Sequence, residues 1–128
     1  MDNTFLILEN DSLTAMAISR SIVNKSNKIV VKRSLIEAES FIDANYIDCI
    51  IANENILYEL SIMEELEETL IRRGVPILFL STADNLFFAD GLNVFAVVEK
   101  PFHPEEISEL VKSVPLRQFA YRSHYKLV

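Results

Sequence analysis

The regular alternation of short apolar runs with amphipathic segments is the feature that most constrains how this chain folds. Such runs have the length and character of buried strands. They occupy residues 5–8, 28–32, 49–52, 77–80 and 95–98. Segments with helical spacing separate them, and strands that alternate with helices predict a parallel sheet with helices on both faces. We therefore predict an α/β protein, a doubly wound five-stranded parallel sheet in a three-layer α/β/α sandwich.

Apolar spacing and capping residues predict where the helices lie. Asp11 is available to cap a first helix, and Ser34 begins a capping box before a second. A third helix is predicted over residues 56–73, and a last one begins at Pro104 and ends before Pro115. The predicted inward residues are Leu13, Ala17, Ile18 and Ile22 in the first helix and Leu60, Met63, Leu66 and Leu70 in the third. The glutamates of the third helix, including Glu59, are predicted to face outward.

The size and composition of the chain favour one globular domain with a short tail. The chain has 128 residues, half of them hydrophobic, with two glycines and four prolines. We expect a domain over residues 1–115 and a basic, aromatic tail over residues 116–128. The tail carries three basic residues, no acid and three aromatic rings, a combination that can bind nucleic acid. A net charge of −7 argues against nucleic-acid binding, and packing of the tail on an acidic surface, its own or a partner's, is favoured.

The cysteine count and the length of the apolar runs indicate the cellular compartment of the protein. Cys49 is the single cysteine and stands inside an apolar run, so no internal disulfide can form. The first apolar run stops at Glu9, and no run approaches the roughly 20 residues of a membrane span. The expectation is a cytoplasmic protein without a membrane association.

Polar and charged residues follow four of the predicted strands. They are Glu9, Asn10 and Asp11 after the first, Asn53 after the third, Ser81 and Thr82 after the fourth, and Lys100 and Pro101 after the fifth. The carboxyl ends of parallel strands meet at one edge of a sheet, where open α/β sheets bind their ligands. We expect these residues to lie together there.

This constellation resembles the receiver domain of bacterial response regulators. The resemblance covers about residues 5–115, and its most specific pieces are residues 75–81 and 99–102. It implies a flavodoxin-like fold with strand order 2-1-3-4-5 and a two-component phosphorelay module. In such a module an acidic pair binds Mg²⁺, an aspartate accepts a phosphoryl group from a histidine kinase, and a lysine contacts that group. Lys100 with a cis bond to Pro101 matches the lysine, Ser81 or Thr82 the hydroxyl switch, and Glu9 the first acid.

Two amides replace the residues that carry this chemistry. The second acidic position is Asn10 and the phosphoacceptor position is Asn53. An amide nitrogen is no nucleophile toward a phosphoryl donor, and an amide oxygen coordinates a cation only as a neutral dipole. We therefore expect no phosphoryl transfer to residue 53, no catalytic residue, weak or absent Mg²⁺ binding and no other cofactor. Either an amide pairing with Lys100 or Glu9 locks the site, or the amides record drift after phosphorylation ceased to matter. Lys100 is predicted to pair with Glu9.

The signalling side also departs from the receiver pattern. In receiver domains a rotating aromatic side chain helps to transmit the signal, and its position here holds Val97. The segment from Ser81 to Lys100 is also short, which shortens or distorts the fourth helix that the receiver pattern places there. The candidate interface residues are Leu86, Phe87, Phe88 and Val97, because three adjacent apolar residues cannot all face inward on a helix. The fourth helix, fifth strand and last helix would then form a docking face, which is also the candidate homodimer surface.

Three functions follow from these residues. The leading hypothesis is an atypical, phosphorylation-independent receiver domain that acts as a protein–protein interaction module, a pseudo-receiver and not an enzyme, whose partner is a signalling protein or a second copy. The alternative is a response regulator phosphorylated on a substitute carboxylate, Asp11 or Glu54. A nucleotide- or flavin-binding domain is disfavoured, because the turn at residues 9–11 is acidic and has no glycine.

Overall fold

A five-stranded parallel sheet forms the middle layer of the computed structural model, which describes residues 3–82 and 89–114. The strand order is β2-β1-β3-β4-β5. The strands are β1 (Asn3–Leu8), β2 (Asn27–Lys32), β3 (Cys49–Asn53), β4 (Ile77–Ser81) and β5 (Val94–Glu99). The predicted fold class and strand order are confirmed. Each predicted strand is present, and the observed strands extend one or two residues beyond most of the apolar runs.

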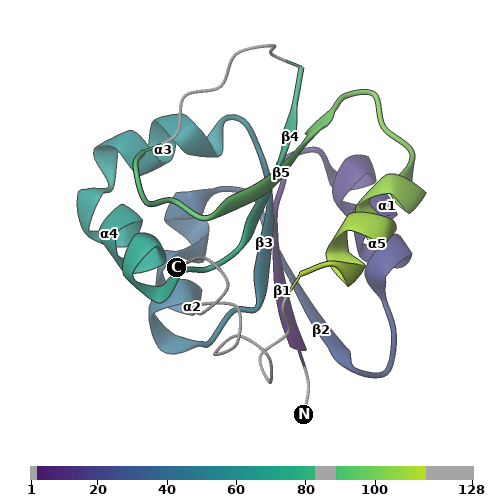
Figure 1. Ribbon diagram of the computed structural model, residues 1–128, viewed down its shortest axis with the longest axis horizontal. Helices are drawn as coiled ribbons and strands as arrows, with labels where there is room; N and C mark the ends of the chain where they lie inside the picture. Colours follow the sequence, from purple (N-terminus) through teal and green to yellow (C-terminus); the bar gives the residue numbers. More distant parts are fainter. Residues whose placement is uncertain (1–2, 83–88, 115–128) are drawn as a thin grey trace.

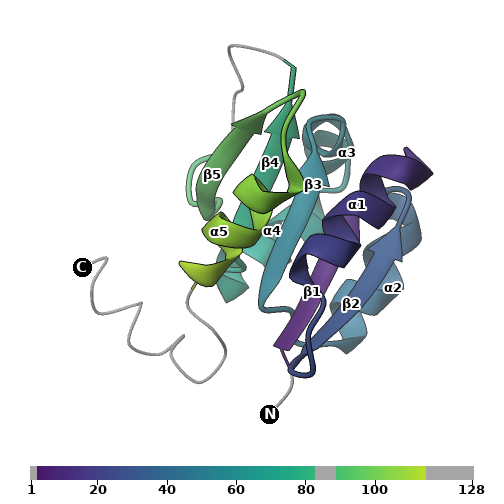
Figure 2. The same cartoon turned by 90° about the vertical axis from the view of Figure 1, so that its right-hand side faces the viewer.

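Helices cover both faces of the sheet (Figure 1). They are α1 (Ser12–Ile22), α2 (Leu35–Ala44), α3 (Ile56–Ile62), α4 (Glu64–Arg73) and α5 (Pro104–Lys112). Figures 1 and 2 show α1 and α5 on one face and α2, α3 and α4 on the other. The buried apolar residues accordingly form two clusters, one on each side of the sheet. The three central strands are buried along their whole length, which explains why they read as continuous apolar runs.

The inward face of α1 differs from the predicted one. Leu13 was expected in the core but is 74% exposed, and the buried residues are Ala15, Ile18 and Ile22. Residues three and four apart share a face of a helix, and Leu13 is two positions before Ala15, on nearly the opposite side. The apolar spacing of the segment fits two faces, and packing against α5 and the sheet selected one of them.

The single helix predicted over residues 56–73 is two helices. Met63 has φ −112° and ψ 64°, so it ends α3 and precedes α4. Its backbone N–H still bonds to the carbonyl oxygens of Glu59 and Leu60. Leu60, Leu66 and Leu70 are buried as predicted, since both halves keep an apolar face toward the sheet. A break between two apolar positions leaves that pattern intact, which is why the spacing did not reveal it.

Glu59 was predicted to face solvent, and this prediction is wrong. Its carboxylate oxygens accept hydrogen bonds from the backbone N–H groups of Leu35 and Ile36, each at 3.1 Å. These N–H groups belong to the first turn of α2 and have no partner within that helix, and a negative charge is favourable there. Glu59 therefore joins α3 to the start of α2.

The connection between β4 and β5 is described only in part. Leu86, Phe87 and Phe88 lie outside the described residues, as does the tail over residues 116–128, so the predictions made for them stay predictions. Residues 89–93 contain no helix. Within the described parts of the chain, no helix is long and apolar enough to cross a membrane.

Candidate functional site

The polar residues predicted to gather at one edge of the sheet do so. Glu9 follows the last residue of β1, Asn53 and Ser81 are the last residues of β3 and β4, and Lys100 follows β5. Parallel pairing aligns these ends, because Leu8 lies opposite Ala52 and Ser81 opposite Glu99. The Lys100 backbone N–H also donates to the Ser81 carbonyl oxygen at 2.8 Å. The peptide bond between Lys100 and Pro101 is cis, as the resemblance implied.

Glu9 is the centre of this site. Its side chain is buried, and Oε1 accepts hydrogen bonds from Asn53 Nδ2 at 3.3 Å and from the Asp11 backbone N–H at 3.2 Å. Oε2 lies 3.5 Å from Lys100 Nζ, which is the predicted ion pair. A buried carboxylate needs such partners to remain charged in the folded protein. Both oxygens of Glu9 are thus occupied by groups of the chain itself.

Asn53 uses both ends of its amide. Nδ2 donates to Glu9 Oε1 and, at 3.4 Å, to Asn10 Oδ1, whereas Oδ1 accepts from the Asn55 backbone N–H at 2.9 Å. An aspartate at this position could not donate either of the first two bonds. The bond to Glu9 is the amide pairing that the first of the two alternatives for Asn10 and Asn53 expects.

The residues at this edge do not fit a Mg²⁺ ion. Mg²⁺ prefers an octahedron of oxygens with carboxylates among them, and here Glu9 is bonded to an amide, a backbone N–H and a lysine. Asn10 and Asn53 add only neutral oxygens. Across residues 3–82 and 89–114, no three His, Cys, Asp or Glu side chains are grouped so that they could hold a metal.

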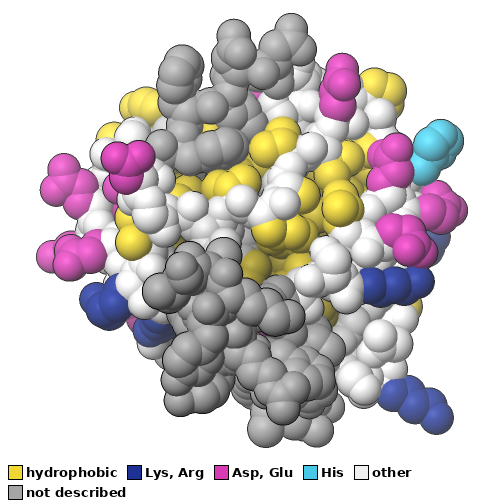
Figure 3. Space-filling model, in the orientation of Figure 1, with side chains coloured by type: hydrophobic (Ala, Val, Ile, Leu, Met, Phe, Trp, Pro, Cys, Tyr) yellow, Lys and Arg dark blue, Asp and Glu magenta, His cyan; other side chains and the backbone are white. Residues whose placement is uncertain are grey.

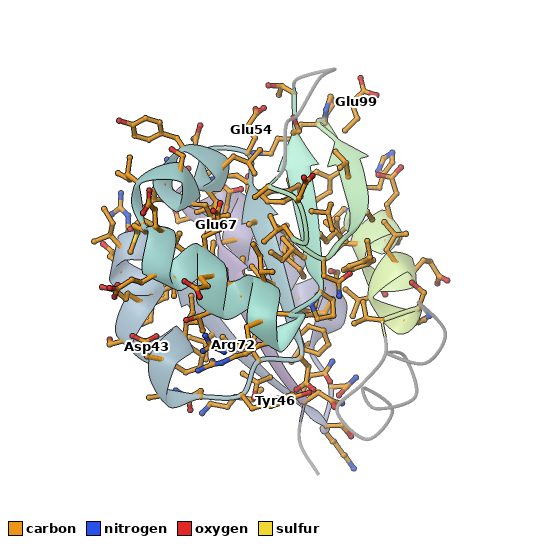
Figure 4. The ribbon with its side chains drawn as sticks, turned by 60° about the vertical axis from the view of Figure 1, so that its left-hand side comes forward. Asp43, Tyr46, Glu54, Glu67, Arg72 and Glu99 are labelled. Carbon is orange, nitrogen blue, oxygen red and sulfur yellow. The ribbon has the colours of Figure 1, made fainter. Side chains whose placement is uncertain are left out.

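Glu54, which the sequence suggested only as a substitute phosphoacceptor, contacts the end of β4. Its Oε2 accepts from Ser81 Oγ at 2.8 Å, and its Oε1 accepts from Thr82 Oγ1 at 2.9 Å and from the Thr82 backbone N–H at 3.2 Å. Figure 4 shows Glu54 at the edge of the sheet where β4 ends. These bonds, first that from Ser81, hold the pKa of Glu54 below its ordinary value, and the charge of Lys100 adds to the effect. One signal could have revealed this role, since Glu54 follows β3 and the two hydroxyl residues end the adjacent strand.

The lowered pKa of Glu54 predicts how its contribution to stability depends on pH. A carboxylate whose folded pKa is lowered stabilises the folded state fully above its unfolded pKa, near 4.5, and loses that contribution as the pH falls through the folded value. We expect the native chain to have a larger free energy of unfolding than Glu54→Gln at pH 7. This difference should become smaller below about pH 4.5. Urea unfolding from pH 7 to pH 3 measures it. The Glu68→Gln variant makes the same charge change on the exposed face of α4, and an equal narrowing there would contradict the prediction.

Asp11, the other suggested substitute carboxylate, caps α1. Its Oδ1 accepts from the Leu13 backbone N–H at 3.2 Å and its Oδ2 from Thr14 Oγ1 at 2.6 Å. The bond from Thr14 is the main reason that the pKa of Asp11 is lowered. Its carboxylate is therefore used as a helix cap, and its side chain is exposed at the rim of the site.

Of the candidate interface, the structure describes the part that β5 and α5 form. A groove between them is lined by four apolar side chains, four glutamates and one lysine: Val97, Val98, Pro101 and Leu110, then Glu99, Glu105, Glu106 and Glu109, and Lys100. Val97 is 48% exposed, so a small aliphatic side chain meets solvent at the position where the resemblance implies an aromatic one. Figure 3 shows apolar side chains gathered on the face of the molecule where β5 lies in Figure 1.

Solved structures of receiver domains share this fold. The receiver domain of a Francisella response regulator aligns with a TM-score of 0.68 and 22% identity, over 87% of this chain and 94% of that one. A receiver protein from Burkholderia phymatum gives 0.66 and 20%, over 86% and 92%. An orphan response regulator of H. pylori gives 0.64 and 18%, over 87% and 94%. No protein-family model and no curated protein matches the chain. The fold is that of CheY-like receiver domains, and the site lies at the edge of the sheet where the resemblance places receiver chemistry.

Proposed function

We propose that this chain is a phosphorylation-independent receiver domain of bacterial, cytoplasmic two-component signalling, which acts by binding a protein partner and has no catalytic activity of its own. The observation that carries the proposal is Asn53. It stands at the end of β3, where phosphoryl transfer needs a carboxylate, and its amide is bonded to Glu9 and Asn10. An amide so placed cannot form an acyl phosphate.

The neighbouring carboxylates support the same conclusion. Glu9 is buried and paired with Lys100, Asp11 caps α1, and Glu54 is bonded to Ser81 and Thr82. A carboxylate attacks through an oxygen lone pair, and the hydrogen bonds that these three residues accept lower the electron density of their oxygens and fix their orientation, which makes them poorer nucleophiles. Mg²⁺, which would offset the charge of the transferring group, also lacks its ligands.

The groove between β5 and α5 is the proposed docking surface. Its apolar floor suits a protein partner, and its four glutamates favour one that presents basic side chains. In a symmetric pair of these chains the same patch would face itself, so glutamates would approach glutamates. A basic signalling protein is therefore preferred to a second copy, and the homodimer through this face stays a prediction.

Intact mass spectrometry tests phosphorylation independence. After incubation with acetyl phosphate and Mg²⁺ we expect no phosphoryl adduct on the native chain, because residue 53 is an amide and the carboxylates of Glu9, Asp11 and Glu54 already accept hydrogen bonds. The Asn10→Asp, Asn53→Asp double variant, which restores both acids on the same scaffold, is expected to gain one phosphoryl group. An adduct on the native chain would contradict the proposal and favour the substitute carboxylates; mapping it to Glu54 or Asp11 would then identify the acceptor.

A further inference from the structure

Three hydrogen-bond donors at the end of β4 point at one carboxylate. Ser81 Oγ, Thr82 Oγ1 and the Thr82 backbone N–H all lie within 3.2 Å of an oxygen of Glu54. We propose that the end of β4 is a site for a small oxyanion, and that the chain's own Glu54 occupies it as a permanent intramolecular ligand. The Glu54 carboxylate would then fill the oxyanion site at the end of β4 whether or not the chain accepts a phosphoryl group.

The donors match what an oxyanion requires. Two hydroxyl groups and a backbone N–H can bond to different oxygens of one anion, and bonds to a charged acceptor are stronger than bonds between neutral groups. Ser81 is 1% exposed, so its hydroxyl is shielded from bulk water. The positive charge of Lys100 acts on the same carboxylate. A carboxylate, sulfate or phosphate has the charge and the oxygens for this donor set.

Attachment to the chain gives Glu54 an advantage over free anions. Glu54 directly follows the last residue of β3, and β3 is hydrogen-bonded to β4. A tethered ligand meets its site at an effective concentration in the millimolar range or above, set by the short connection. Free anions at lower concentration are thus kept out, and Ser81 and Thr82 are held by a ligand that cannot be removed by hydrolysis.

Permanent occupation of this site by Glu54 would fix how the domain presents its docking surface, an inference that rests on the proposed function. In a domain that works without phosphorylation, a carboxylate that bonds permanently to Ser81 and Thr82 keeps these two residues in one arrangement. The docking surface formed by β5 and α5 adjoins that edge of the sheet, because Ser81 pairs with Glu99. The domain would then present that surface constitutively.

Amide NMR of ¹⁵N-labelled protein titrated with sulfate tests the site. Ionic strength is held constant with chloride, so that the shift of the Thr82 amide reports binding. We expect saturable binding to Glu54→Ala that is at least roughly tenfold tighter than to the native chain. Glu68→Ala, which removes the same charge from the exposed face of α4, should bind sulfate as weakly as the native chain does.

Two further variants keep the test decisive. Glu54→Gln preserves side-chain size if Glu54→Ala does not fold, and it should also bind sulfate more tightly than the native chain. Adding Ser81→Ala to either variant should weaken sulfate binding, since it removes one donor. Equal sulfate affinity of the native chain and a folded Glu54 variant would overturn the assignment. Sulfate cannot be transferred, so this result is independent of phosphoryl transfer, on which the proposed function depends.

Discussion

Replacing Asn10 and Asn53 with aspartates is expected to make the stability of this chain depend on Mg²⁺. Without divalent cations, the Asn10→Asp, Asn53→Asp double variant should lose roughly 3 kcal/mol of unfolding free energy. The native Asn53 amide donates to Glu9 and to Asn10. In the variant these bonds are replaced by three carboxylates that repel one another near a single lysine, Lys100.

Magnesium should reverse most of that loss. A cation that binds the folded variant alone, at a concentration about 100 times its dissociation constant, adds about 2.7 kcal/mol. Urea unfolding in EDTA and in MgCl₂ measures both effects. The matched control is Asn24→Asp, which adds a carboxylate at an exposed position where Asn24 Oδ1 already accepts from the Ser26 backbone N–H. If Mg²⁺ stabilises the native chain as much as the double variant, the native site binds the cation and our account of it is wrong.

The second large effect is expected from Lys100→Met. This change leaves the buried carboxylate of Glu9 without the cation that lies 3.5 Å away. A buried charge that loses its partner is strongly destabilising, and because the Lys100 side chain is 28% exposed, water offsets part of the loss. We expect a decrease of about 2 kcal/mol in the free energy of unfolding, measured by urea denaturation at pH 7.

A double-mutant cycle separates the charge from the shape of Lys100. Glu9→Gln combined with Lys100→Met removes both charges, and it should be more stable than Lys100→Met alone. Lys112→Met is the control, because Lys112 pairs with Glu109 where both side chains are largely exposed, and its loss should be below about 1 kcal/mol. A double variant no more stable than Lys100→Met would show that Glu9 does not need the lysine.

Much of the fold was predictable because the strands are short, apolar and buried on both sides. Their alternation with helices predicted the three layers, and the ends of parallel strands had to meet at one edge. For the same reason the sequence predicted that Glu9 and Lys100 would pair, although 91 positions separate them. Asn10 and Asn53 excluded acyl-phosphate chemistry at residue 53 from their side-chain chemistry alone, before any geometry was known.

Other features depended on contacts between distant segments. The exposure of Leu13, the break at Met63 and the contact of Glu59 with α2 each had a local pattern compatible with two outcomes. Tertiary packing decided the outcome in each case. Helix propensity and apolar spacing are weak predictors where the two outcomes differ little in local free energy.

The sequence alone therefore determined the layers, the strand order that the resemblance implied and the presence of an amide at residue 53, because these follow from apolar periodicity and from which atoms a side chain carries. Only the tertiary structure decided what the remaining polar groups bind. Glu54 is the clearest case: whether its carboxylate meets water, a metal or a hydroxyl depends on which strand lies next to β3. Hydrogen bonds form over about 3 Å, and one-dimensional spacing does not resolve that distance between segments far apart in the chain.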